Sequence, residues 1–165
     1  MQISSTLAFA AAPDRVAAMF IDPGFATWLG SEVGALNVTA TPLERGLSAV
    51  YTIASPEAAA LFLGPHMTLV QTTSWDESPA ADKTRGGRLT MSLDGLPASA
   101  DGPLSLTPTP TGSEVTYAAD FHVRVPVIGG KLEKLVGANL TKLLDSLGRI
   151  GTSWLDQHPE PRTAG

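Results

Sequence analysis

Hydrophobic and polar residues alternate along most of the chain, which is the pattern of strands with one buried and one solvated face. The clearest example is residues 115–124, where Tyr117, Phe121 and three other apolar residues share one parity. The same alternation predicts further strands at residues 2–10, 36–40, 47–53, 67–75, 89–93 and 104–106. The pattern therefore predicts an antiparallel sheet with one face on the core.

Two short helices are predicted after the first strand. Apolar residues recur there at the i, i+3, i+4 spacing of a helical face, first from Val16 to Phe20 and again from Phe25 to Leu29. Asp22-Pro23-Gly24 separates the two stretches, because Pro and Gly interrupt helices. We expect a V-shaped helix pair here, and residues 56–64 predict another short helical connection.

A much longer helix is predicted for residues 131–155, with a length of roughly 37 Å at 1.5 Å per residue. Its charged residues share one side, and the opposite side is a wide apolar arc. The centre of the arc is formed by Leu132, Val136, Leu143, Leu147, Ile150 and Trp154, with Leu135 on one flank and Leu140, Leu144 and Leu155 on the other. The arc is wider than an ordinary surface stripe, and a flat sheet would not cover it. We therefore predict an α+β fold in which a curved antiparallel sheet wraps around this helix and the two short helices close one end.

This order of elements resembles the helix-grip fold of the START/Bet v 1-like superfamily, also called SRPBCC. Three stretches are more closely similar to an uncharacterised actinobacterial family of unknown function within it: residues 71–75 (QTTSW), residues 125–133 (VPVIGGKLE) and residues 153–155 (SWL). The resemblance implies one START/Bet v 1-like domain over residues 1–156 that holds a cavity, and it implies no catalytic residues. Residues 157–165 are polar and Pro-containing, which predicts a disordered tail.

The run at 125–133 predicts a tight corner between the last strand and the long helix. Pro126 ends the strand because it has no N–H for the ladder, and Gly129 and Gly130 would supply backbone angles closed to other residues. A helix N-terminus can also bind phosphate. No other Gly-rich phosphate motif accompanies this corner, so the structural interpretation is favoured.

Composition and charge exclude several classes of function. The net charge is -5 with no run of Lys or Arg, so nucleic acids and anionic membranes are poor partners. No apolar run approaches the ~20 residues of a membrane span, and membrane insertion is not expected. The absence of Cys excludes disulfides and thiolate sites, and it fits a cytoplasmic protein.

The sequence contains few candidates for catalysis or metal binding. His66, His122 and His158 do not have metal-ligand spacing, and no nucleophile elbow or HExxH motif occurs. We therefore predict no catalytic residue, no metal and no cofactor.

The polar residues predicted to point inward favour ligand binding instead, because small-molecule sites are mostly apolar with a few converging polar groups. The predicted ligand-binding residues are Tyr51, Gln71, Met91, Tyr117, Leu132, Val136, Asn139 and Leu143. The ligand would be an apolar small molecule, such as a lipid or a polyketide-like compound.

Two alternatives stay open. Some relatives in the superfamily are polyketide cyclases or aromatases. That chemistry needs positioned acids and bases, and no Asp, Glu, His or Lys is predicted to point inward. The other alternative is a protein-interaction domain with a filled core. The size of the cavity discriminates this alternative from ligand binding.

Overall fold

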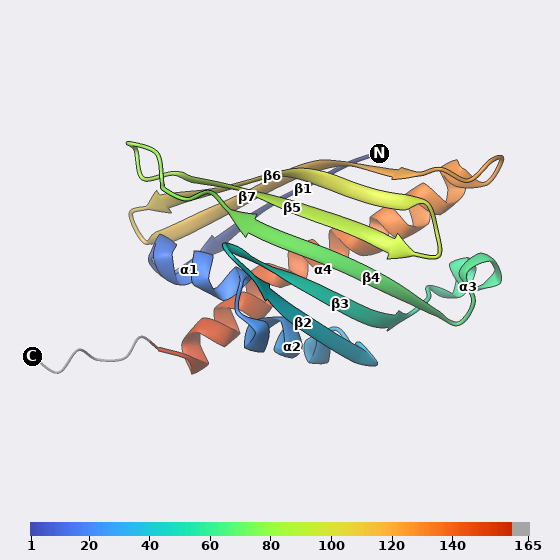
Figure 1. The fold of residues 1–165 in the computed structure, drawn as a ribbon, viewed down its shortest axis with the longest axis horizontal. Coiled ribbons are helices and arrows are strands. Elements are labelled where there is room, and N and C mark those ends of the chain that lie inside the picture. The colour runs from blue at the N-terminus through green and yellow to red at the C-terminus, as the bar shows by residue number, and fades with distance from the viewer. Residues whose placement is uncertain (160–165) are drawn as a thin grey trace, which may run out of the picture.

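The long C-terminal helix predicted by the sequence is α4 (Gly129–Gln157), and it lies across one face of a curved antiparallel sheet (Figure 1). The structure is a computed structural model that describes residues 1–159, except for the side chains of residues 58, 59 and 62. The α+β helix-grip prediction is confirmed.

Within residues 1–159 the sheet has seven strands in the order β1-β7-β6-β5-β4-β3-β2, and all neighbours are antiparallel. The strands are β1 (Gln2–Phe9), β2 (Asn37–Leu43), β3 (Gly46–Ala54), β4 (His66–Trp75), β5 (Arg85–Asp94), β6 (Ala98–Thr109) and β7 (Gly112–Val123). Strands β2 to β7 form a meander. The first strand instead pairs with the last, so β1 and β2 lie at opposite edges.

Helices α1 (Pro13–Phe20) and α2 (Pro23–Glu32) carry the chain between these two edges and cover one end of the sheet (Figure 1). Asp22 lies at the corner between them. Its carboxylate accepts a hydrogen bond from the Gly24 N–H at 2.7 Å, so it is the N-cap of α2. The predicted helix pair is confirmed, and α3 (Glu57–Leu63) forms the predicted connection between β3 and β4 at the opposite end of the sheet.

The strand parity predicted for residues 115–124 is confirmed by burial. In β7 the inward residues from Val115 to Val123 are buried, and His122 faces solvent.

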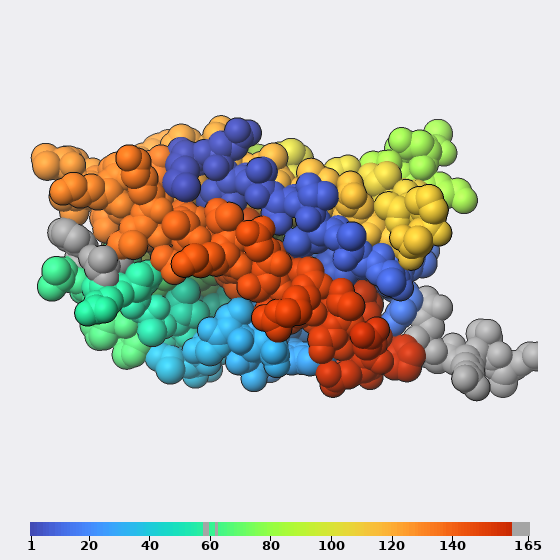
Figure 2. Space-filling view, turned by 180° about the vertical axis from the view of Figure 1, so that it is seen from behind, coloured from blue at the N-terminus to red at the C-terminus, as the bar shows by residue number. Residues whose placement is uncertain are grey.

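The opposite face of the molecule presents α4 between β1 and α2 (Figure 2). Gly151 allows β1 to approach α4, because a Cβ at this position would lie 2.7 Å from the Phe9 ring.

The buried face of α4 is rotated from the predicted centre of the apolar arc. The predicted centre included Leu143 and Trp154, but both are only half-buried. Leu140, Leu144 and Leu155, predicted as flanks, are fully buried instead. Helical periodicity gives the width of an apolar arc, whereas the position of the sheet decides which part of it is covered.

The corner before α4 differs from the prediction. Val127, and neither Gly129 nor Gly130, has the left-handed backbone, with φ 70°, and its side chain is fully exposed. Gly129 has a different role, because a Cβ there would lie 2.8 Å from the Val123 carbonyl oxygen. The glycine therefore provides close packing of the helix start against the end of β7.

The predicted tail begins at residue 157, and residues 160–165 lie outside the described part of the chain. Gln157 is the last residue of α4. The His158 ring stacks on Trp154 with a centroid distance of 3.7 Å, and the Arg15 guanidinium donates to the His158 carbonyl at 2.7 Å. The ordered structure thus continues past the predicted helix end at residue 155.

Candidate ligand-binding cavity

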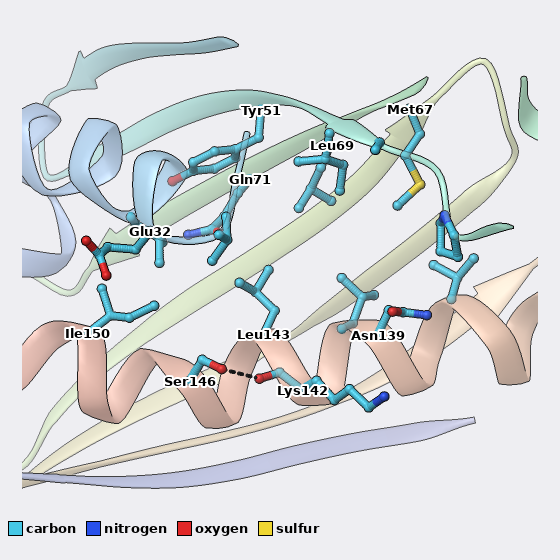
Figure 3. Close-up of a pocket in the computed structure, with 18 of the residues that line it drawn as sticks. Glu32, Tyr51, Met67, Leu69, Gln71, Asn139, Lys142, Leu143, Ser146 and Ile150 are labelled. Atoms are coloured by element: carbon cyan, nitrogen blue, oxygen red, sulfur yellow. Dashed lines mark hydrogen bonds between the residues drawn. The ribbon is translucent and has the colours of Figure 1, made fainter. Parts of the chain in front are cut away.

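A cavity of about 400 Å³ lies between α4 and the strands β3 and β4 (Figure 3). Inward-facing side chains of the sheet form one wall, and these are Tyr51, Ile53, Met67, Leu69, Gln71 and Leu93. Most of this wall is aliphatic because the inward positions of these strands alternate with polar outward ones. Leu29 and Val33 from the α2 end add further apolar surface.

The opposite wall comes from α4 and is also apolar. Val136, Leu140, Leu143 and Ile150 line it from successive turns of the helix. Leu143 points from the helix toward the sheet (Figure 3). Its half-burial is therefore explained by the cavity, since its side chain faces open space where a core leucine would meet other side chains.

Charged and amide groups lie at the rim, and they are exposed. Glu32 comes from α2, and Asn139, Lys142 and Arg149 come from α4. The Glu32 carboxylate accepts a hydrogen bond from the Trp28 indole at 2.9 Å, and the Asn139 amide donates to the Leu135 carbonyl at 2.8 Å. These groups remain solvated, so the deep part of the cavity has no ionised side chain among the described residues.

Two uncharged polar side chains of the sheet, Tyr51 and Gln71, line the cavity. Ser146 of α4 also lines it, but its hydroxyl already donates to the Lys142 carbonyl at 2.8 Å (Figure 3). Tyr51 pairs with Leu69 across β3 and β4, and Gln71 pairs with Ala49, so Tyr51 and Gln71 are diagonal neighbours on the same face. Within the described part of the chain, neither side chain has a hydrogen-bond partner. Both therefore retain their full hydrogen-bonding capacity.

Burial raises the pKa of Tyr51 to about 12, because the charged phenolate would lose its hydration. Tyr117 also has a pKa raised to about 12, first by burial and second by the nearby negative charge of Asp101. Both side chains are neutral phenols at physiological pH. Tyr51 can therefore donate a hydrogen bond into the cavity.

We expect the folded protein to show no tyrosinate absorbance near pH ~10, where an unperturbed tyrosine titrates. Tyr51 and Tyr117 are the chain's two tyrosines, and both should ionise near 12. The unfolded chain releases these protons first, so folding stability should fall as the pH rises from about 10 toward about 12. Absorbance titration with parallel circular dichroism measures both effects, and tyrosinate appearing near pH ~10 in protein that is still folded would contradict the assignment.

The structure brings five of the eight predicted ligand-binding residues together around the cavity, namely Tyr51, Gln71, Val136, Asn139 and Leu143. It places Met91, Tyr117 and Leu132 elsewhere in the buried core, so these three do not line the cavity. The Tyr117 hydroxyl donates to the Leu89 carbonyl at 3.3 Å. Periodicity predicted that these residues point inward, but it could not predict which inward residues border open space.

Sequence reasoning missed several lining residues. Strand parity could have identified Ile53, Met67 and Leu69, because they share the inward face with Tyr51 and Gln71. Lys142 and Arg149 were predicted on the solvent face of the helix; they are exposed, but they also border the cavity. No signal in the sequence indicates which exposed charges lie beside its mouth.

The described residues offer neither a metal-binding cluster nor a membrane-spanning helix. Residues 1–159 contain no group of three or more His, Cys, Asp or Glu side chains that could hold a metal ion. No helix in this part of the chain combines the length and the apolar character needed to cross a membrane.

A curved sheet that holds a long C-terminal helix is the arrangement of the START/Bet v 1-like fold, and similar solved structures have the same fold. TTHA0849 from Thermus thermophilus has a TM-score of 0.67 at 15% identity, covering 97% of this chain and 100% of that one. A START superfamily protein from Mycobacterium smegmatis has a TM-score of 0.56 at 15% sequence identity, and the match covers 96% of this chain and 99% of that one. Norcoclaurine synthase from Thalictrum flavum, in complex with dopamine and hydroxybenzaldehyde, has a TM-score of 0.60 at 14% sequence identity. That match covers 98% of this chain and 89% of the synthase chain.

The chain belongs to the family described as "Protein of unknown function (DUF2505)", whose model matches residues 4–155. It is also similar to the uncharacterized protein Rv0481c of Mycobacterium tuberculosis, with 38% identity over 66 residues, covering 39% of this chain and 38% of that protein. The chain thus spans well under half of the length of this relative. The resemblance to an uncharacterised family is confirmed, and so is the START/Bet v 1-like fold. At identities of 14–15% the solved structures show the fold alone.

Proposed function

We propose that this protein binds an apolar small molecule in the cavity between β3, β4 and α4. The observation that carries the proposal is the volume of about 400 Å³ behind a mostly aliphatic lining. Small-molecule sites commonly have volumes of roughly 300–1,000 Å³ and combine such a lining with a few placed polar groups. Tyr51 and Gln71 are polar groups of this kind.

The energetics of the cavity support a ligand. At ~24 cal/mol per Å³, an empty cavity of this size would cost as much as about 10 kcal/mol, which is comparable with the whole stability of a domain, about 5–15 kcal/mol. Water can enter through the open mouth and reduce the cost, but an aliphatic wall offers water few hydrogen bonds. An apolar ligand would cover the same wall, and burial of apolar surface contributes roughly 25 cal/mol per Å².

The two alternative functions have weaker support. A filled core, which the interaction-domain hypothesis requires, does not agree with a cavity of about 400 Å³. Acid–base catalysis of the cyclase type would need a titratable group that faces the bound molecule. The charged groups that border the cavity, Glu32, Lys142 and Arg149, are exposed at its rim, so the described residues favour binding over catalysis.

We expect Leu143→Trp to weaken ligand binding by more than about tenfold, because the indole would occupy the space that the ligand needs. Leu143 is half-buried and points into the cavity, so the larger side chain can be accommodated without displacing the core. Isothermal titration with a panel of fatty acids and aromatic polyketides would measure the affinities. Circular dichroism would establish that the variant is folded.

Ala138→Trp is the matched control, since it adds the same indole to an exposed position of α4 that does not line the cavity. This control should bind as wild type does. If no compound binds the wild-type protein, or if Leu143→Trp binds as tightly as wild type, the proposal is wrong. In that case a protein-interaction role would become the better hypothesis.

A further inference from the structure

The polar groups inside the cavity carry information about the ligand. Tyr51 is only 4% exposed, and Gln71 is half-buried beside it on the same sheet face. Figure 3 shows both side chains directed into the same part of the cavity, toward the α2 end. No described residue supplies a hydrogen-bond partner for either side chain, so water or a ligand in the cavity must provide one.

We propose that the bound molecule carries an uncharged oxygen acceptor, such as a ketone or ester carbonyl, between the Tyr51 hydroxyl and the Gln71 amide. This inference rests on the proposed function, and it specifies the chemical class of the ligand. The rest of the molecule would extend along the aliphatic wall formed by Leu69, Met67 and Leu143.

The chemistry of the two side chains favours an acceptor. Tyr51 stays protonated at physiological pH because its pKa is raised to about 12, so its hydroxyl is available as a donor. The Gln71 amide nitrogen has two further N–H donors. A carbonyl oxygen has two lone pairs and can accept from both side chains at the same time, which would satisfy both groups with one ligand atom.

The charges around the cavity favour an uncharged oxygen over a carboxylate. A carboxylate placed beside Tyr51 and Gln71 would lose hydration without a buried cation beside it, because Lys142 and Arg149 are both exposed at the rim. Glu32 lies at the same end of the cavity, and its negative charge would oppose a second one (Figure 3). A carbonyl group loses much less hydration on burial.

The test uses three linear compounds of equal chain length: a methyl ketone, the corresponding alkane and the corresponding fatty acid. Their affinities are measured by displacement of an apolar fluorescent dye from wild type, Tyr51→Phe and Gln71→Leu. The ketone should bind wild type more tightly than the alkane does. Each substitution should weaken ketone binding by about three- to tenfold, which corresponds to one lost hydrogen bond, and should leave alkane binding unchanged.

Tyr117→Phe is the matched control, because it removes the hydroxyl of the other buried tyrosine, which does not line the cavity. It should leave ketone affinity unchanged. Tyr51→Phe should fold normally, since the lost hydroxyl has no partner in the described structure, and thermal unfolding would verify this.

Three results would overturn the inference. The polar pair would not select the ligand if wild type bound ketone and alkane equally, or if Tyr51→Phe and Gln71→Leu kept the preference for the ketone. The cavity would remain a binding site in either case. Tightest binding of the fatty acid would contradict the preference for an uncharged oxygen, and its loss in Lys142→Gln or Arg149→Gln would place recognition at the rim. Displacement of the dye by none of the compounds, or failure of the dye itself to bind, would remove the proposed function together with this inference.

Discussion

Leu147→Ala is expected to lower the free energy of unfolding by about 2–5 kcal/mol, which is the usual cost of removing a buried leucine side chain. Leu147 is 6% exposed and lies on the face of α4 that packs against the sheet. The substitution removes apolar contacts and leaves a space that the surrounding strands cannot fill. Urea titration of the variant and the wild type measures the difference.

Leu143→Ala provides the internal comparison on the same helix. Leu143 is half-buried and already borders a cavity, so its truncation enlarges an existing space without creating a closed one. We expect a loss of about 1 kcal/mol, from the smaller apolar area that is uncovered. Equal losses for the two variants would mean that the helix has a different rotation about its axis.

Trp75→Ala is expected to cost about 3–5 kcal/mol, because the side chain joins the end of β4 to helix α1. Trp75 is 4% exposed, and its ring meets Phe20 edge-on at a centroid distance of 6.3 Å. Its indole N–H donates to the Ala17 carbonyl at 3.0 Å. Ala17 is in the last turn of α1, where carbonyls have no partner within the helix, so the tryptophan satisfies one of them.

Trp75→Phe separates the hydrogen bond from the packing. It keeps an aromatic ring but leaves the Ala17 carbonyl without the indole, and we expect a loss of about 1–3 kcal/mol in thermal or urea unfolding. Trp28→Phe is the control, because the Trp28 indole donates to the exposed Glu32 carboxylate. Trp28 is half-buried, and its ring contacts Trp154 at a centroid distance of 5.2 Å, a contact that a phenyl ring can largely keep. Because the lost hydrogen bond is to an exposed carboxylate, that variant should lose less than about 1 kcal/mol. A Trp75→Phe variant as stable as wild type would contradict the proposed role of the buried bond.

The local features of the fold could be predicted because they depend on periodicity and turn chemistry. Alternation identified the strands and their inward faces, and the wide apolar arc required a curved sheet around the last helix. Pro and Gly residues placed the break between α1 and α2 near Asp22. Each of these signals is contained within one continuous stretch of the sequence, so no tertiary contact is needed to identify it.

The cavity depended on contacts that periodicity does not describe. The sequence placed Tyr51, Gln71, Met91 and Tyr117 on an inward face, but only the tertiary structure leaves the first two beside open space and buries the other two in the core. An inward-facing side chain can meet another side chain or a void, and strand parity is the same in both cases. Which of the two occurs is decided by the rotation and placement of one helix against seven strands, and that placement is set by the packing of residues far apart in the sequence.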